Sequence, residues 1–358
     1  DPPHVHLRSR QTEFVGPGRE LAEPQLPDKV RLGYFGPQGE DDLWRAAMMA
    51  IEDANRQGGY RGRPFQLVPG WSKDPWGTGV TQVTQMVYRD GVWGIIGGPD
   101  GPSTHLAEQV VAKARLVLLS PGSTDKSVNL ANVPWMFSCL PGDHLLAPPL
   151  VDDLVKRVGN QPFVVVSAND HDSRHFAKEL DRCFATHNIV PKYKYVIEPQ
   201  HIDWPAVLDK VLSAKPRAVV VAADPVTSAQ FANRLRNQGY EDLLFGGPSF
   251  GRRAFREEAG AAAENAIFPS LTSGADNEFC DRFKQRYNYA PDYAAMCSYD
   301  AVSLLVSAIH SVGLNRAKIG DAIRELSPYD GINGTIRWDP LGSNQRPISL
   351  TTHAPTPQ

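Results

Sequence analysis

The chain has 358 residues, enough to bury roughly three quarters of its unfolded surface and to divide into two domains. Hydrophobic residues make up 41%, charged residues 22% and aromatic residues 9%, which excludes a disordered chain and a coiled coil. The net charge of -3 offers no basic field to a polyanion, so we expect no nucleic-acid partner. The longest apolar runs, such as 218–223, are far shorter than the ~20 residues of a membrane span, so we expect none.

The four cysteines, Cys139, Cys183, Cys280 and Cys297, have no C-x-x-C spacing. A zinc ribbon or a thioredoxin-type redox motif therefore cannot be built from neighbouring cysteines. Cys280 and Cys297 lie in two successive predicted helices, and the turn between them allows a disulfide. Buried free thiols are the favoured interpretation.

Residues 1–29 are rich in proline and show no apolar periodicity, so we expect an extended arm outside the core. The chain begins at Asp1 without an initiator Met or an apolar leader, as a mature form or a trimmed chain would. This observation permits export.

From residue 30 the hydrophobic pattern alternates between the periods of strands and helices. The predicted order is strand 30–35, helix 43–56, strand 65–68, helix 78–90, strand 92–96, helix 104–113 and strand 116–119. The first helix places Leu43, Ala47, Ile51 and Ala54 on one apolar stripe, and the glycines at 58–59 end it. This stripe is expected to pack on a sheet.

The same unit repeats in a second series. The predicted order is helix 144–158, strand 163–167, helix 175–187, strand 193–197, helix 204–214, strand 218–223, helix 227–238, strand 243–245 and strand 266–268. Residues 218–223 are apolar at every position, as expected of a parallel strand covered on both faces. Two parallel α/β lobes follow, with their ligand-facing loops at the carboxyl ends of the strands.

Two loops rich in glycine and hydroxyl groups follow strands of the first lobe. The segment 97–104 contains Ser103 and Thr104, either of which can cap the following helix, and the segment 120–124 is Ser-Pro-Gly-Ser-Thr. Such loops at one sheet edge can hold a carboxylate. N-capping and turn chemistry alone explain a single Ser-Thr pair. Only the presence of two such loops at one sheet edge indicates a ligand site.

In the second lobe, the segment 169–175 carries His171 and His175 four residues apart beside carboxylates, which are metal-ligand types. The favoured interpretation is a solvated turn into a helix, with Asp172 or Ser173 as its cap, and we expect no metal. Asp224 follows the buried strand. It either caps the next helix or points into a cleft between the lobes.

The segment 247–251 matches the G-x-S-x-G pattern of a hydrolase nucleophile elbow around Ser249. The later histidines do not fit a triad, since His310 lies in an apolar helix and His353 in a proline-rich tail. We therefore expect no enzyme, and a glycine-bounded turn whose Ser249 and Phe250 contact a ligand. No phosphate-binding glycine motif occurs at a strand-to-helix turn, so no nucleotide cofactor is expected.

From Val30 to about Ser349 the chain resembles the type I periplasmic binding proteins, specifically the branched-chain amino acid and amide (Leu/Ile/Val-binding) group that serves ABC importers. The markers are Gly58-Gly59-Tyr60-Arg61-Gly62-Arg63-Pro64-Phe65, Asp74-Pro75, the Ser103-Thr104 loop, Ser120-Pro121-Gly122-Ser123-Thr124, Ser298-Tyr299-Asp300-Ala301, and Gly331 to Asp339 ending in Arg337-Trp338-Asp339. No single marker is specific, but the six occur in order.

The resemblance implies an α/β fold of two Rossmann-like lobes, each with a parallel central sheet, joined by a hinge that the chain crosses three times. It implies a first lobe of residues 30–141 and 271–329. It implies a second lobe of residues 142–270 and 330–350, followed by a tail at 351–358.

The resemblance also implies a ligand carboxylate held by the loop Gly101 to Ser103 and by Gly122 and Thr124. The second lobe would close with Asp172, Asp224 and Ser249. Members that bind amino acids usually place an acid for the α-ammonium where Ser249 stands, and tyrosines where the two aspartates stand. Asp224 could replace that acid. Otherwise the ligand is uncharged and largely apolar, in a cavity bounded by Phe250 and the Tyr34-Phe35 loop, because an unpaired ammonium is costly in a closed cleft.

The predicted function is that of a monomeric periplasmic solute-binding protein. It captures a small organic ligand, an amino acid or amide among the options, between its lobes by hinge closure and delivers it to the permease subunits of an ABC importer. The alternatives are a carrier of apolar cargo (a lipid or an aromatic compound), a ligand sensor on the same fold and, last, a serine hydrolase at Ser249.

Overall fold

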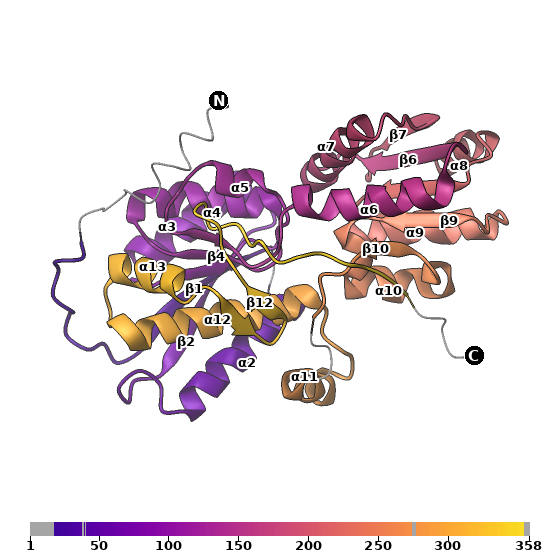
Figure 1. The fold of residues 1–358 in the computed structure, drawn as a ribbon. Coiled ribbons are helices and arrows are strands. Elements are labelled where there is room, and N and C mark those ends of the chain that lie inside the picture. The colour runs from indigo at the N-terminus through magenta and orange to yellow at the C-terminus, as the bar shows by residue number, and fades with distance from the viewer. Residues whose placement is uncertain (1–17, 38, 40, 274–276, 354–358) are drawn as a thin grey trace. The chain divides into compact units, whose positions relative to one another are not determined.

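The computed structural model describes residues 18–37, 39, 41–273 and 277–353. The chain forms two units (Figure 1). Unit 1 combines the residues up to 142 with 273–346, and unit 2 combines 143–272 with the residues from 347 onward. The chain therefore passes between the units three times.

Unit 1 is built on a five-stranded sheet in the order β2-β1-β3-β4-β5, in which every pair of neighbours is parallel. Its strands are β1 (Val30–Gly36), β2 (Phe65–Trp71), β3 (Ile95–Gly97), β4 (Leu118–Ser120) and β5 (Met136–Ser138). This order reverses direction between β1 and β3, and ligands of such sheets bind at the carboxyl ends of the strands beside that reversal. The loop after β3 is therefore the first place to look for a site.

The helices of unit 1 come from both of its chain segments. They are α2 (Asp42–Arg56), the π-helical turn η1 (Pro75–Gly79), α3 (Val80–Tyr88), α4 (Gly101–Ala114), α5 (Ser127–Leu130), α11 (Glu278–Tyr287), α12 (Tyr293–Val312) and α13 (Arg316–Glu325). The expected stripe of α2, Leu43, Ala47, Ile51 and Ala54, is buried. A hairpin of β11 (Tyr329–Gly331) and β12 (Gly334–Ile336) follows α13.

α12 is the one described helix that is long and apolar enough to cross a membrane, contrary to the expectation that no segment is. Its apolar side chains are buried in unit 1, where it packs along α2 (Figure 1). The two helices come from opposite ends of the chain. Its hydropathy is therefore accounted for by this packing in unit 1.

Unit 2 contains a six-stranded sheet in the order β13-β10-β9-β8-β6-β7. Its elements are α6 (Asp143–Val158), β6 (Phe163–Ala168), α7 (His171–Thr186), β7 (Tyr193–Ile197), α8 (Trp204–Ser213), β8 (Ala218–Ala222), α9 (Pro225–Asn237), β9 (Leu243–Gly246), the 3₁₀ turn η2 (Pro248–Gly251), α10 (Arg253–Ala259), the 3₁₀ turn η3 (Gly260–Ala263), β10 (Ile267–Pro269) and β13 (Leu350–Thr352). β8 lies between β6 and β9 with all its residues buried, as its apolar sequence predicts. Within the described strands of this six-stranded sheet, only β13 is antiparallel to its neighbour.

The observed units differ from the expected lobes mainly near the C-terminal end of the chain. Residues 330–346, which the resemblance assigns to the second lobe, belong to unit 1. The third passage of the chain therefore falls after residue 346. The expected tail from 351 contributes Thr351 and Thr352 to β13, which pairs with β10 at the edge of the unit 2 sheet.

The described part of the expected arm, from Gly18 to Lys29, is attached to unit 1. Glu23 accepts hydrogen bonds from the Tyr60 hydroxyl (2.6 Å) and the Leu314 backbone N–H (3.0 Å). Arg19 forms a bidentate ion pair with Asp321 of α13. These contacts could not be predicted from the sequence because each joins residues far apart in the chain. The rest of the arm, residues 1–17, lies outside the described residues.

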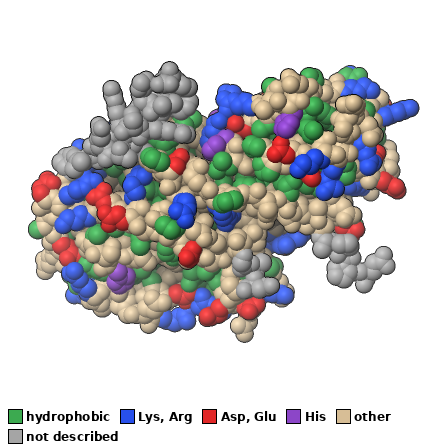
Figure 2. Space-filling model, viewed as in Figure 1, with side chains coloured by type: hydrophobic (Ala, Val, Ile, Leu, Met, Phe, Trp, Pro, Cys, Tyr) green, Lys and Arg blue, Asp and Glu red, His purple; other side chains and the backbone are tan. Residues whose placement is uncertain are grey.

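All four cysteines are free thiols in the structure. Cys280 Sγ lies 3.7 Å from Met296 Sδ, and Cys297 Sγ accepts a hydrogen bond from Asn333 Nδ2 at 3.2 Å. The disulfide considered for Cys280 and Cys297 is therefore not formed. Acidic and basic side chains are interspersed over the face drawn in Figure 2, in keeping with the small net charge.

The turn between β11 and β12 is held by a buried carboxylate of α12. Asp300 accepts hydrogen bonds from the backbone N–H groups of Ile332 (2.8 Å) and Asn333 (3.1 Å). Burial raises the pKa of Asp300 to about 6, against the opposing effect of these hydrogen bonds. Asn333 in turn accepts from the Ser273 N–H (2.9 Å), and its carbonyl accepts from Arg346. The first and last residues of the second chain segment of unit 1 are thus bonded to the same residue of this turn.

We expect Gly331→Ala to destabilise unit 1 by roughly 1 to 3 kcal/mol, because a Cβ at Gly331 would lie 2.5 Å from Asp300 Cγ. The control is Gly320→Ala in α13, where the nearest atoms lie 3.6 Å from the added carbon and alanine favours the helix. Urea unfolding followed by circular dichroism measures both. Equal midpoints for the two variants would contradict the proposed close packing.

Candidate functional site

The two glycine- and hydroxyl-rich loops of unit 1 lie against each other, as their positions after β3 and β4 require. A Cβ on Gly122 would lie 2.6 Å from the Pro99 carbonyl oxygen, and one on Gly98 would lie 2.6 Å from Ser103 Cβ. Only glycine permits these approaches. The loops therefore form one continuous surface at the carboxyl edge of the sheet.

Gly101, Ser103 and Thr104 lie in the first turn of α4 rather than in the preceding loop. The helix begins earlier than expected because Asp100 is its cap, accepting from the Ser103 N–H at 2.8 Å. The predicted caps, Ser103 and Thr104, are therefore wrong. The Thr104 hydroxyl lies 2.7 Å from the Asp100 carbonyl and 3.0 Å from Ser120 Oγ, so it joins the two loops.

The remaining hydroxyls of the pair of loops differ in what they bond. Ser123 Oγ accepts from the Asp125 N–H at 3.2 Å and so stabilises its own turn. No described residue bonds the hydroxyls of Ser103 and Thr124. Two hydroxyl groups at the edge of the unit 1 sheet thus have donors to offer to a ligand.

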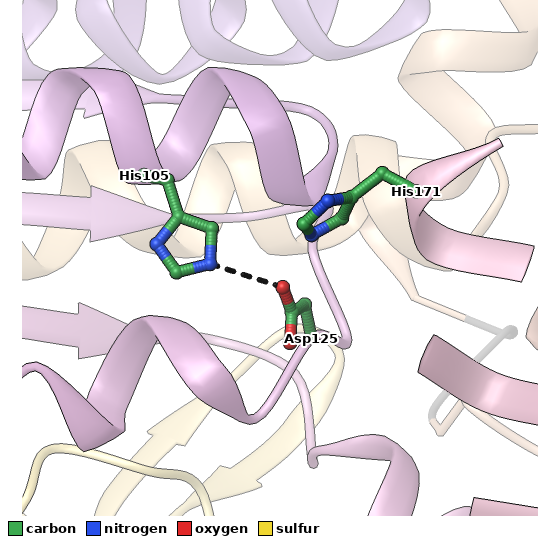
Figure 3. A group of neighbouring side chains, drawn as sticks. All are labelled: His105, Asp125 and His171. Atoms are coloured by element: carbon green, nitrogen blue, oxygen red, sulfur yellow. Dashed lines mark hydrogen bonds and ion pairs between the residues drawn. The ribbon is translucent and has the colours of Figure 1, made fainter. Parts of the chain in front are cut away.

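An ion-pair cluster of His105, Glu108 and Asp125 lies next to these loops and supports them. His105 Nε2 lies 3.1 Å from Asp125 Oδ2 and 2.9 Å from Ser127 Oγ, and His105 Nδ1 lies 3.7 Å from Glu108 Oε2. Figure 3 shows the bond from His105 on α4 to Asp125, which directly follows Thr124; His171, also drawn, belongs to α7 of unit 2. The cluster fixes the end of the second loop to α4.

Burial disfavours the imidazolium form, but the carboxylates of Asp125 and Glu108 outweigh it and raise the pKa of His105 to about 9. Burial also raises the pKa of Glu108, against the effect of the His105 charge. These residues were not predicted as part of a site. A usable signal was present, since His105 and Glu108 are three residues apart and share one face of α4.

In unit 2, the carboxylates after β6 and β8 are helix caps. Asp170 accepts from the Ser173 N–H (3.0 Å), so the predicted caps Asp172 and Ser173 are wrong. Asp172 lies in the first turn of α7, where the His171 and His175 rings stack 4.3 Å apart. Asp224 Oδ1 accepts from the N–H groups of Val226 (3.0 Å) and Thr227 (3.1 Å). Of the two roles considered for Asp224, the cap is the one observed.

Phe250 and Tyr34 are core residues, contrary to their expected place beside a ligand. The Phe250 ring is fully buried, stacks on Phe255 at 4.0 Å and covers the backbone of Gly246. Tyr34 lies within β1 and is 1% exposed, packed edge-on against Trp44 (5.1 Å). Aromatic residues in a sheet or after it look alike in sequence whether they face the core or a ligand.

The surroundings of Ser249 do not form a catalytic triad. Ser249 Oγ lies 3.4 Å from Ser228 Oγ at the edge of unit 2. His353 Nε2 instead bonds the Phe250 carbonyl at 2.8 Å, and burial lowers its pKa. Within the described part of unit 2, the nucleophile and the base needed for hydrolysis are therefore not bonded to each other.

A family model described as "Periplasmic binding protein" matches residues 33–352. The chain belongs to the periplasmic binding protein family. This confirms the family predicted from the six ordered markers, and the two parallel α/β units confirm the predicted fold class. Proteins of this family are the substrate-binding components of ABC transporters rather than enzymes.

Curated relatives carry amino-acid-binding names. The "Amino acid binding protein" of Pseudomonas aeruginosa is 22% identical over 341 residues, which cover 90% of this chain and 89% of that protein. The "Leu/Ile/Val-binding protein homolog 1" of Brucella melitensis is 22% identical over 314 residues, covering 85% and 83%.

Solved structures of the family share the fold. LivJ of Streptococcus pneumoniae in complex with isoleucine has a TM-score of 0.83 at 20% identity, with 91% of this chain and 96% of that chain covered. A solute-binding protein of R. palustris in complex with benzoate has a TM-score of 0.80 at 16% identity, with 90% and 93% covered. At these identities the comparison shows the fold alone.

The His105 cluster predicts a stability that falls at alkaline pH. The folded pKa of about 9 exceeds the ordinary value of about 6.5, so the stabilisation is complete below pH ~6.5 and is lost as the pH rises through ~9. We expect the wild type to lose roughly 1 to 3 kcal/mol more than His105→Gln between pH 6 and 10 in urea unfolding. His201→Gln, at an exposed position, serves as control and should follow the wild type. Parallel pH profiles of wild type and His105→Gln would refute the charged pair.

The cap role of Asp224 predicts a separation of stability from affinity. Asp224→Asn keeps an oxygen for the N–H groups of α9 but removes the charge, so stability and carboxylate affinity should both stay near wild type. Asp224→Ala should cost about 0.5 to 2 kcal/mol of stability. Thermal unfolding and titration calorimetry measure the two effects. A large, selective loss of amino-acid affinity in Asp224→Asn would instead show that this carboxylate pairs with an α-ammonium.

Proposed function

We propose that this protein is the exported, monomeric solute-binding component of an ABC importer and that its ligand is a small organic carboxylate. Membership of the periplasmic binding protein family supports the class. Ligand-driven closure of the two units, followed by delivery to permease subunits, is the mechanism that we propose for it.

The carboxylate is proposed to bind at the edge of the unit 1 sheet. The observation that carries this proposal is the pair of hydroxyls, Ser103 and Thr124, which no described residue bonds and which lie on two loops in close contact at Gly98 and Gly122. Gly101 lies in the first turn of α4, where the helix dipole favours a negative charge. Gly122 and Ser123 complete the second loop, and the His105 cluster fixes its far end.

The carboxylate is also what the ligands of the structural neighbours share. Isoleucine, leucine, benzoate and 3,4-dihydroxybenzoic acid, named for four of these structures, all carry one. They differ in whether an ammonium accompanies it. In this chain Asp224 caps α9 and Ser249 carries no charge, so we propose that an ammonium is not required.

The proposal is tested with benzoate, isoleucine and the uncharged benzamide. We expect at least one of the two acids to raise the thermal unfolding midpoint and to reduce the radius of gyration in small-angle scattering, and benzamide to do neither. A ligand that shifts a population from 1:99 to 99:1 must favour the closed state by about 5.5 kcal/mol, which both measurements would detect. An equal response to benzamide would refute carboxylate recognition.

Thr124→Ala should weaken binding of the responding acid by roughly 1 to 3 kcal/mol in calorimetry, the usual cost of a lost hydrogen bond to a charge. The matched control is Thr186→Ala at the end of α7, whose hydroxyl bonds the Arg182 carbonyl on an exposed helix face. An unchanged affinity in Thr124→Ala would place the ligand elsewhere.

A further inference from the structure

Unit 1 contains a second hollow, away from the carboxyl edge of its sheet. It has a volume of about 440 Å³ and lies where α2, α11, α12 and the β11–β12 turn meet. Its walls include Arg56 in the last turn of α2, about four turns beyond Asp42, where that helix begins. β2 starts soon afterwards at Phe65 opposite Val30, the first residue of β1, which places this end of α2 at the amino edge of the sheet. The hollow is therefore separate from the site proposed for the transported ligand.

The Asp53 carboxylate in this hollow already accepts as many hydrogen bonds as it can. Asp53 Oδ1 accepts from Arg56 and from Arg282 Nη1 (2.9 Å), and Asp53 Oδ2 accepts from Arg282 Nη2 (2.5 Å) and from the Tyr299 hydroxyl (2.7 Å). A carboxylate has about four lone-pair positions for hydrogen bonds. Asp53 therefore has no capacity left for a cationic ligand.

The guanidinium groups of Arg282 and Arg56, by contrast, have N–H donors available for a ligand. Arg282 Nε is buried and has no hydrogen-bond partner among the described residues; the Oε1 of Glu278 lies 3.9 Å away on a side chain that is 88% exposed. Arg56 makes one ion pair and is 67% exposed, so most of its five N–H donors remain for a ligand. A buried, unsatisfied N–H of a charged group favours an anionic partner.

The rest of the lining is apolar or aromatic. Phe279 is buried and packs against the Tyr299 ring at 4.7 Å, and Ile332 from the β11–β12 turn completes this wall. A bound molecule would thus meet guanidinium donors on one side and an aromatic surface on the other. Pockets of a few hundred cubic ångströms with this division bind small molecules with one polar group and an apolar body.

We propose that this hollow is a second ligand site, specific for a small aromatic monocarboxylate. The carboxylate accepts hydrogen bonds from Arg282 Nε and from Arg56, displacing Glu278, while the ring packs on Phe279, Tyr299 and Ile332. The site does not depend on the function proposed for the sheet edge, since it uses none of those residues.

The probe for this site is 4-fluorophenylacetate, followed by fluorine NMR, with 4-fluorophenylacetamide as its uncharged counterpart. We expect the acid to bind at least tenfold more tightly than the amide, because only the acid forms charge-assisted hydrogen bonds. Glu278→Gln removes the competing carboxylate from an exposed position and should tighten binding several-fold. Equal binding of acid and amide, or no binding of the acid at millimolar concentration, would overturn the proposal.

Two matched substitutions on α11 locate the bound probe. Arg282→Lys keeps a cation beside Asp53 but lacks the Nε–H and should weaken binding about tenfold. Arg286→Lys changes the neighbouring arginine, which pairs with Glu52 outside the hollow, and should leave binding unchanged. Equal effects of the two variants would overturn the proposal. A loss of binding in Thr124→Ala would also overturn it, by placing the probe at the sheet edge.

Discussion

A helix that starts at the carboxyl edge of a parallel sheet must find acceptors for its first N–H groups, and this requirement governs both units. Aspartates meet it repeatedly: Asp100 caps α4, Asp170 caps α7 and Asp224 caps α9. With the Asp100 carboxylate occupied as the cap of α4, we propose that the Ser103 and Thr124 hydroxyls recognise the anion.

Much of the fold could be predicted from the sequence because its signals are local. The stripe of α2 and the unbroken apolar run of β8 each specify one element and its burial. The placement of 330–346 was not predictable in this way. That segment is held in unit 1 by hydrogen bonds of Asp300, Asn333 and Trp338 whose partners are far away in the chain. The local sequence of a hairpin does not indicate which unit it packs against.

The candidate site likewise combines features that local sequence signals predict with features that depend on distant contacts. Glycine-hydroxyl loops after adjacent strands are visible in sequence, and the structure places them together. Phe250 and Tyr34 were misassigned because side-chain direction depends on packing: Phe250 covers Gly246, and Tyr34 packs against Trp44. The spacing of His105 and Glu108 on α4 was visible in the sequence, but the pairing of His105 with Asp125 was not, because it requires the second loop to fold back onto α4. Charge pairs between residues distant in the chain show no characteristic sequence spacing.

The division of unit 1 into two chain segments has a consequence for its biosynthesis. α2 emerges early from the ribosome, whereas α12, which packs along its apolar stripe, emerges some 240 residues later, or roughly 10 to 50 seconds at usual elongation rates. During that interval the nascent chain carries an uncovered apolar helix, which is a surface that holding chaperones bind. Unit 2 is nearly continuous and lacks only the edge strand β13. The core of unit 2 can therefore fold before the second chain segment of unit 1, residues 273–346, has been synthesised.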